Sequence, residues 1–251
     1  MPITIKSARE IELMTEAGRI LEIVHDELAK SLHPGMSTMD IDRLGEKLIR
    51  SHGCIPSFKN YNGYPASICV SVNDEVVHGI PSKHRIIREG DIVSLDAGVI
   101  YHGYHSDAAR THAIGKITPE AEKLIQVTRE SFFEGIKFAK AGNHLNDISS
   151  AIQAYAEGFG YGVVRDLVGH GIGSHLHEDP EVPNFSRKRR GILLRPGMTL
   201  AIEPMINEGS WDVVWMDDDW TVVTRDGSLS AHYENTILIT EGEPEILSLL
   251  K

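Results

Sequence analysis

Two halves of the chain carry chemically similar residues in the same order. Each half contains a His-Gly-Ile triplet, then an apolar segment that ends in a carboxylate, then a His-x-carboxylate triplet. A single Asp at a strand end is usually a turn residue and a single His usually a packing residue, but matched residues in matched order are hard to explain that way. The set is His78, Asp96 and Asp107 in the first half and His170, Glu203 and Glu234 in the second.

This combination of side chains is suited to binding metal ions. Four carboxylates gathered in one place repel each other and cannot all stay ionised unaided. Two divalent cations would supply four positive charges against the four negative ones. Carboxylates with one or two imidazoles suit Mn, Fe, Co or Zn better than a thiolate-type structural zinc site. Because water between two such ions ionises near neutral pH, the set predicts a dinuclear-metal hydrolase.

A repeat of constant spacing indicates how these residues are positioned. The segments 88–96 and 195–203 share the pattern Arg-x-Gly-x-x-aliphatic-small-aliphatic-carboxylate, and their last residues, 96 and 203, are 107 positions apart. The segments 35–40 and 142–147 have the same spacing. No linker or change of composition separates the halves. We therefore predict a single catalytic domain, 1–251, with an internal repeat at roughly 7–117 and 118–251.

Each half begins with helical signals and continues with strand signals. Ser7 and Glu10 form a capping-box pattern, and Pro119 occupies the first position of a similar helix. Gly53 and Gly160 are expected to end the second helix of each half. Short β-branched strands are expected at 67–72, 91–96, 199–202, 220–224 and 235–240. Helices followed by strands favour an α+β fold, duplicated about a pseudo-twofold axis, with helices outside a central antiparallel sheet.

The spacing of the first two carboxylates suggests a hairpin. Asp96 and Asp107 are separated by eleven positions, with a turn signal at 101–103 between them. Two adjacent antiparallel strands would place facing side chains about 5 Å apart, close enough to share a metal ion.

The bulk composition narrows the possible partners. The net charge of −11 argues against binding to DNA, although a basic cluster at 187–190 is either a solvated loop or a docking patch for an acidic partner. No apolar run approaches the ~18–20 residues of a membrane span, and no signal peptide pattern opens the chain. We expect a cytoplasmic monomer in which Cys54 and Cys69 are packed thiols.

Several motifs together resemble the type I methionine aminopeptidases, in their short bacterial form. The resemblance covers almost the whole chain. It implies the duplicated "pita-bread" metallopeptidase fold. The motifs are NDEVVHGIP at 73–81, SLDAG at 94–98, HSDAART at 105–111, GHGIG at 169–173, HEDP at 177–180, IEPM at 202–205 and ENT at 234–236.

The resemblance also implies a role for each site residue. The implied metal ligands are Asp96, Asp107, His170, Glu203 and Glu234. His78 and His177 would hydrogen-bond the substrate without holding metal, and Glu203 would also carry protons. The implied methionine pocket is lined by Phe58, Tyr61, Tyr64, Cys69, His78 and Trp220. Leu176 stands where many members of the family carry an aromatic residue, so the pocket wall departs from the family there.

The implied activity is removal of the initiator methionine from nascent polypeptide N-termini, with a small second residue preferred. Contact with the ribosome is a further implied partnership, but the segment 207–220 is acidic and offers no basic loop for it. Two alternatives remain. One is a proline-specific aminopeptidase or dipeptidase on the same fold, although those enzymes usually carry an extra N-terminal domain. The other is a non-catalytic binding protein, which would be expected to have lost metal ligands.

Overall fold

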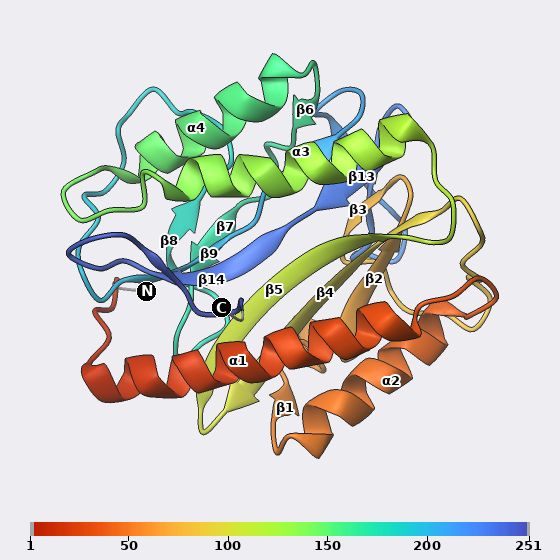
Figure 1. The fold of residues 1–251 in the computed structure, drawn as a ribbon, viewed down its shortest axis with the longest axis horizontal. Helices are drawn as coiled ribbons and strands as arrows, with labels where there is room; N and C mark the ends of the chain where they lie inside the picture. The colour runs from red at the N-terminus through yellow and green to blue at the C-terminus, as the bar shows by residue number, and fades with distance from the viewer. Residues whose placement is uncertain (1–2, 250–251) are drawn as a thin grey trace.

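The computed structural model describes residues 3–249. Two pairs of helices lie on opposite sides of the strands (Figure 1). The first pair is α1 (Ala8–Ser31) and α2 (Thr38–Ser51), and the second pair is α3 (Pro119–Ile136) and α4 (Leu145–Gly158). Among the described residues, no helix combines the length and the apolarity needed to cross a membrane.

The helices begin and end where the sequence signals lie. The Ser7 hydroxyl accepts from the Glu10 N–H while the Glu10 carboxylate accepts from the Ser7 N–H, so the predicted capping box is present. Thr118 caps α3 and Pro119 is its first residue. Gly53 and Gly160, just past α2 and α4, have φ values of 74° and 86°, which a residue without a Cβ adopts most readily.

A nine-stranded sheet joins the two halves of the chain. Its order is β1-β4-β5-β14-β9-β7-β8, with β2 also paired to β4 and β15 to β14. Every pairing among the described strands of this sheet is antiparallel, which confirms the α+β fold with a largely antiparallel sheet. The strands are β1 (Ile55–Pro56), β2 (Ile68–Val72), β4 (Ile92–Tyr101), β5 (Tyr104–Ala113), β7 (Gly169–Gly171), β8 (Glu178–Val182), β9 (Thr199–Ile202), β14 (Glu234–Leu238) and β15 (Glu245–Ile246).

Two small antiparallel sheets complete the fold. One has the order β13-β10-β6 and the other β11-β12-β3. Their strands are β3 (Glu75–Val77), β6 (Gly162–Val163), β10 (Met205–Asn207), β11 (Val213–Trp215), β12 (Val222–Thr224) and β13 (Ser230–His232). The strand expected at 220–224 begins two residues late, because the N–H groups of Trp220 and Thr221 donate to the Asp218 carboxylate instead of a neighbouring strand.

The β4–β5 hairpin carries the first two acids of the predicted site. Its turn residues His102 and Gly103 both have positive φ, the conformation that matches the twist of a two-residue hairpin. The prediction that Asp96 and Asp107 face each other directly is wrong, because Asp96 pairs with Ala109 and Asp107 pairs with Gly98. The two acids are diagonal neighbours on the same face, close enough for each carboxyl to shift the pKa of the other.

The junction of the two halves is the pairing of β5 with β14. Ala109 pairs with Glu234 and Ala108 with Asn235, so the acids of the two halves meet at the centre of the sheet. On either side lies a separate apolar cluster. Leu21, Leu28 and Leu95 belong to the first cluster and Phe132, Ile152 and Leu200 to the second. The organisation of 1–251 as one domain with a repeat at 7–117 and 118–251 stays a prediction.

One close approach ties α1 to the end of the described chain. A Cβ added to Gly18 would lie 2.1 Å from the Leu247 carbonyl oxygen. Gly to Ala within a helix ordinarily stabilises by about 0.5–1 kcal/mol. Here we expect Gly18→Ala to lower the free energy of unfolding by roughly 1–3 kcal/mol in urea titration, because backbone must shift. Gly158→Ala in α4 is the control, since nothing lies within 4 Å of its added Cβ. Equal stability of the two variants would contradict this packing.

Candidate active site

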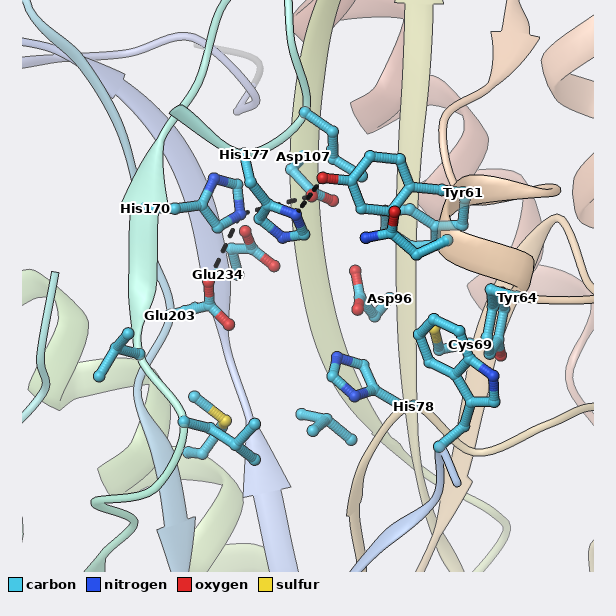
Figure 2. A pocket seen from close by; sticks show the side chains of 18 of the residues that line it. Tyr61, Tyr64, Cys69, His78, Asp96, Asp107, His170, His177, Glu203 and Glu234 are labelled. Atoms are coloured by element: carbon cyan, nitrogen blue, oxygen red, sulfur yellow. Dashed lines mark hydrogen bonds and ion pairs between the residues drawn. The ribbon is translucent and has the colours of Figure 1, made fainter. Parts of the chain in front are cut away.

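A cavity of about 300 Å³ opens where the two halves meet. Every residue that the sequence assigned to metal, catalysis or the methionine pocket lines this one cavity (Figure 2). Those residues are Phe58, Tyr61, Tyr64, Cys69, His78, Asp96, Asp107, His170, His177, Glu203, Trp220 and Glu234, and Leu176 lines it as well. Their proximity is observed, whereas the role of each stays a prediction.

Sequence reasoning missed several wall residues. They are Asn62, Val77, Asp166, Leu167, Val168 and Met205. Val77 and Met205 lie inside quoted motifs and could have been included for that reason. The segment 166–168 nearly adjoins the His170 motif, but Leu167 and Val168 are ordinary apolar residues and Asp166 has no counterpart in the repeated pattern. His232, just outside this wall, was recognised only as part of the repeat, although it lies beside two of the acids.

Different strands bring the acidic side chains together. Asp96 comes from β4, Asp107 from β5, and Glu234 begins β14. Glu203 directly follows β9, and His170 lies on β7. The His170 Nε2 is 3.7 Å from Glu203 Oε1 and 3.9 Å from Asp107 Oδ2. These distances are too long for hydrogen bonds, but ligands about 2.0–2.2 Å from one ion can be up to about 4.3 Å apart.

The acids are in an environment that opposes ionisation. Burial raises the pKa of Asp96 to about 7, although a hydrogen bond from Asp107 acts against this. Burial, followed by the charges of Glu234 and Asp96, raises the pKa of Asp107 well above its usual range. Burial and neighbouring carboxylates likewise raise the pKa of Glu203 and Glu234. In the protein without a cation, these groups therefore tend to hold protons.

The lowered pKa values of the cavity histidines favour the neutral imidazole, which can bind a metal ion or donate one hydrogen bond. Burial lowers the pKa of His170 to about 3, and that of His78 to about 4. The His170 Nδ1 lies 2.9 Å from the Gly171 carbonyl, to which it donates when neutral, so the Nε2 lone pair points towards the acids. Burial also lowers the pKa of His177.

The donor set fits a divalent metal ion. The groups Asp107–His170–Glu234 and Glu203–His232–Glu234 each offer three ligand atoms that lie within 4.8 Å of one another. Asp96 Oδ1 and Glu234 Oε1 are buried and have no hydrogen-bond partner among the described residues. Unpaired carboxylate oxygens at such depth are costly unless a cation satisfies them. Oxygen-rich ligation with imidazole suits Mn, Fe, Co or Zn.

Aromatic and sulfur-containing side chains form the wall next to the acids. Tyr64 packs against Trp220 with ring centroids 5.1 Å apart, and its hydroxyl donates to the Gly79 carbonyl at 2.9 Å. The Cys69 thiol is buried beside them and does not form a disulfide. His177 is hydrogen-bonded through Nδ1 to the Tyr61 hydroxyl at 2.8 Å. Such a wall makes soft contacts with a thioether.

His78 reaches this cavity from a strained backbone position. Its φ of 61° lies in the left-handed region, which residues other than glycine seldom adopt. The neighbouring Gly79 holds the conformation: its carbonyl accepts from Val70 and its N–H donates to the Ser71 hydroxyl. A Cβ at Gly79 would lie 2.4 Å from the Val70 carbonyl oxygen, so only glycine fits. Strain of this kind is common at functional sites.

A buried carboxylate and imidazole cluster within a duplicated α+β fold defines a metallohydrolase. The sequence profile of Metallopeptidase family M24 matches residues 12–241. The methionine aminopeptidase of Clostridium acetobutylicum is 59% identical over 98% of this chain and 99% of its own. The chain therefore belongs to metallopeptidase family M24, whose members use divalent metal.

Solved structures agree with this assignment. The methionine aminopeptidase of Thermotoga maritima has a TM-score of 0.97 and 46% identity, covering 99% of this chain and 100% of that one. The Xaa-Pro dipeptidase of Bacillus anthracis has a TM-score of 0.80 and 26% identity, and it is matched over 98% of this chain and 62% of its own. The resemblance read from the motifs and its pita-bread fold are thus confirmed, and the chain is a metallopeptidase enzyme.

Without metal, the acid cluster should make the protein less stable as pH rises. Carboxyls with raised pKa stabilise the metal-free fold at low pH, and this contribution is lost as pH rises, for Asp96 from about 4 to about 7. Bound cations remove that penalty and compete with the protons. The same Mn²⁺ concentration is used at both pH values, set at 100-fold over the Kd measured at pH 8. We expect it to raise Tm by roughly 5–10 °C at pH 8 and by clearly less at pH 5, where protons weaken metal binding. If the difference in Tm between metal-loaded and chelator-treated protein becomes smaller as pH rises, this prediction is contradicted.

Proposed function

We propose that this chain is a dinuclear-metal methionine aminopeptidase that removes the initiator methionine from nascent polypeptides. The observation that carries the proposal is the composition of one cavity. Acidic side chains and His170 line one part of this cavity, and aromatic and sulfur-containing side chains line another. The similarity to methionine aminopeptidases supports the same activity.

The charge balance supports two ions rather than one. Among the carboxylates that line the cavity, the four acids Asp96, Asp107, Glu203 and Glu234 each have a raised pKa that opposes ionisation without a cation. Two divalent ions match that charge. His170 would add an imidazole to the acids that hold them. When bound, such ions supply positive charge that lowers the pKa of water and stabilises a developing oxyanion.

Glu203 is suited to move protons during hydrolysis. It lies at the rim of the cluster, with its side chain 14% exposed where that of Glu234 is 2% exposed. Burial and the charges of Asp96 and Asp107 raise its pKa well above the usual range, so this carboxyl holds a proton more readily than a solvated one and is suited to proton transfer. Its carboxylate would accept a proton from the attacking water and pass it to the leaving amine.

His78 and His177 would hold the substrate on either side of the scissile bond. Both line the cavity, where loss of hydration lowers the pKa of each, that of His78 to about 4. A neutral imidazole can donate one hydrogen bond and accept another. The hydrogen bond between His177 Nδ1 and the Tyr61 hydroxyl fixes the imidazole ring, so that its Nε2 is available to the peptide.

The apolar wall would select methionine at the first position. A cavity of about 300 Å³ suits one unbranched side chain, and Tyr64, Cys69 and Trp220 give it soft contacts. The peptide carbonyl must approach the acid cluster closely, which favours a small second residue. The same site would take its substrate from newly made chains in the cytoplasm. A ribosomal contact and a monomeric state remain part of the proposal without a surface assigned to them.

Variants of Glu203 and His78 should separate metal binding from chemistry. Glu203→Ala is expected to lower kcat by more than about 10³-fold and to weaken metal binding, because it removes a ligand and a proton carrier. His78→Ala is expected to lower kcat by about 10²–10⁴-fold with metal content unchanged. Peptide turnover and elemental analysis measure both. Activity of Glu203→Ala within tenfold of the parent, or a metal-free His78→Ala protein, would contradict these roles.

The choice of substrate distinguishes this proposal from the proline-specific alternative. We expect the N-terminal residue to be released from Met-Ala-Ser, hardly from Met-Leu-Ser and not at all from Ala-Pro-Ser, and we expect a chelator to stop the release until metal is restored. Liquid chromatography of the products measures all three in one assay. Faster hydrolysis of the Xaa-Pro peptide would establish the alternative, and hydrolysis that persists after complete metal removal would refute the metal mechanism.

A further inference from the structure

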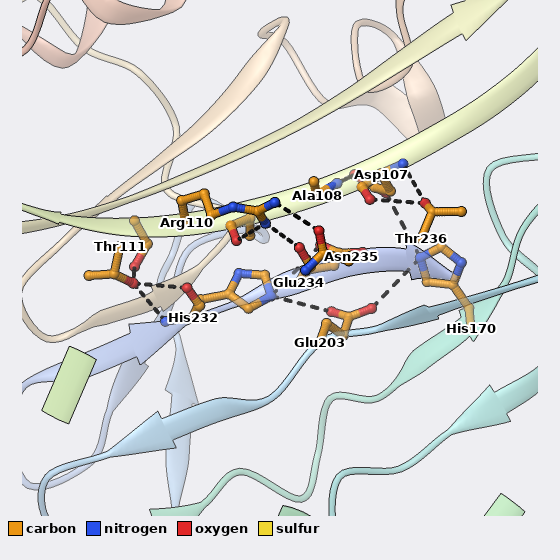
Figure 3. Close-up of polar contacts among 12 residues, drawn as sticks. Asp107, Ala108, Arg110, Thr111, His170, Glu203, His232, Glu234, Asn235 and Thr236 are labelled. Carbon is orange, nitrogen blue, oxygen red and sulfur yellow. Dashed lines mark hydrogen bonds and ion pairs between the residues drawn. The ribbon is translucent and has the colours of Figure 1, made fainter. Parts of the chain in front are cut away.

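A short loop carries His177 into the cavity. It spans residues 173–177, between β7 and β8, and it has no regular secondary structure. The His177 ring lies against the ring of His170 with centroids 4.2 Å apart, and its Nδ1 lies 2.8 Å from the Tyr61 hydroxyl (Figure 2). Figure 3 shows the His170 ring beside the carboxylates of the acid cluster. A small displacement of the loop would therefore move His177 relative to that cluster.

The carboxylate of Glu178 ties this loop to the N-terminal segment. Glu178 follows His177 directly, and its Oε1 accepts from the His175 N–H at 3.2 Å. Its Oε2 accepts from the Lys6 ammonium and from the Thr4 hydroxyl, both at 2.7 Å. Burial alone would raise the pKa of Glu178, but these hydrogen bonds outweigh burial and hold the pKa below its usual range. The group is therefore an anion with every bond directed at the loop or the segment before α1.

The ion pair between Lys6 and Glu178 is buried and joins residues that are 172 positions apart. The two side chains are only 4% and 3% exposed, which is rare for a lysine unless it is paired. The segment before α1 lies beside strands of the second half (Figure 1), where the Lys6 N–H donates to the Gly197 carbonyl at 2.8 Å. A residue near the start of the chain thus supplies the charge beneath a loop of the second half.

The other end of the loop rests on the same pair. Gly173, its first residue, packs so closely that an added Cβ would lie 2.4 Å from Lys6 Cε and 2.6 Å from Glu178 Oε1. The Gly173 carbonyl also accepts from the His105 N–H on β5 at 2.8 Å. Both ends of the loop are therefore fixed at Lys6 and Glu178, and His177 lies between them.

We propose that Lys6 is a positioning residue for the reaction: its ion pair with Glu178 fixes the loop and so sets the place of the His177 imidazole. The inference rests on the role proposed for His177 and extends it to a residue that, within the described chain, does not line the cavity. Lys6 acts through Glu178 and does not touch the substrate. Misplacement of a catalytic group by about 1 Å can cost about 10²-fold in rate, so a fixed loop matters for turnover.

Removal of the Lys6 charge tests the proposal. Lys6→Met keeps a long apolar side chain over Gly173 but leaves Glu178 without its cation. We expect kcat/KM for Met-Ala-Ser to fall by about 10–100-fold with metal content unchanged. Lys140→Met is the control, because Lys140 also pairs with a distant residue, Glu243, at 2.5 Å, but does not line the cavity. The control should retain the parental kcat/KM, and a folded Lys6→Met protein that does the same overturns the proposal.

A double-mutant cycle separates positioning from general stabilisation. If Lys6 acts through His177, Lys6→Met should lower kcat/KM by less than about twofold in a His177→Ala background. In a His78→Ala background it should cause its full loss, because His78 comes from the first half of the chain and not from this loop. Equal losses in both backgrounds would show a merely structural role and overturn the proposal.

A milder variant keeps the test decisive if Lys6→Met does not fold. Thr4→Val removes one hydrogen bond to Glu178 and leaves the ion pair in place. We expect it to lower kcat/KM by about 2–5-fold in the parent and to have no further effect in His177→Ala. Parental activity of Thr4→Val, or the same loss without His177, overturns the positioning role alone. Parental activity of His177→Ala itself would instead overturn the role of His177 in the proposed function.

Discussion

The mutual repulsion of four buried carboxylates is the constraint around which this fold is arranged. Asp107 and Glu234 are 4% and 1% exposed, and burial of acids so close together costs free energy that apolar packing does not return. Arg110 supplies one opposing charge from behind: it donates to the Glu234 carbonyl and to Asn235 Oδ1, and its charge lowers the pKa of Glu234. One guanidinium cannot balance four acids, so the cluster needs either protons or cations to offset its remaining charge.

Duplication explains how such a cluster can be assembled, and divergence explains why it is useful. The pairing of β5 with β14 brings equivalent strands together at the centre of one sheet. Equivalent histidines then differ in their surroundings. His170 faces two acids, whereas its repeat partner His78 packs edge-on to Trp220 with ring centroids 6.2 Å apart. His232 faces two acids, whereas its partner His105 contacts Ser57.

Local signals in the sequence predicted the helices and most strands well, because caps and turns act over a few residues. The capping box at Ser7 and the turning glycine at Gly53 are found as expected. Register is different, since it depends on partners distant in the chain. The sequence therefore placed Asp96 opposite Asp107, although hairpin pairing sets them diagonally. The late start of β12 likewise depends on a side chain, Asp218, that competes for backbone N–H groups.

The site residues that could be predicted from the sequence are those whose side chains have a specific chemistry. Acids and histidines in repeated order pointed to metal, and all of the assigned residues line one cavity. Wall residues such as Leu167 and Val168 carry no such signal, because an apolar side chain has the same appearance in a core and in a pocket. His232 was visible in the repeat, yet only the three-dimensional distances to Glu203 and Glu234 distinguish it from His105.

The central claim is that metal ions hold the acid cluster together. An anomalous difference map from crystals of this protein grown with Mn²⁺ tests it directly. The account predicts two peaks among Asp96, Asp107, Glu203 and Glu234, one of them beside His170. A map with no peak in this cluster, from crystals saturated with Mn²⁺ at pH 8, would contradict the account.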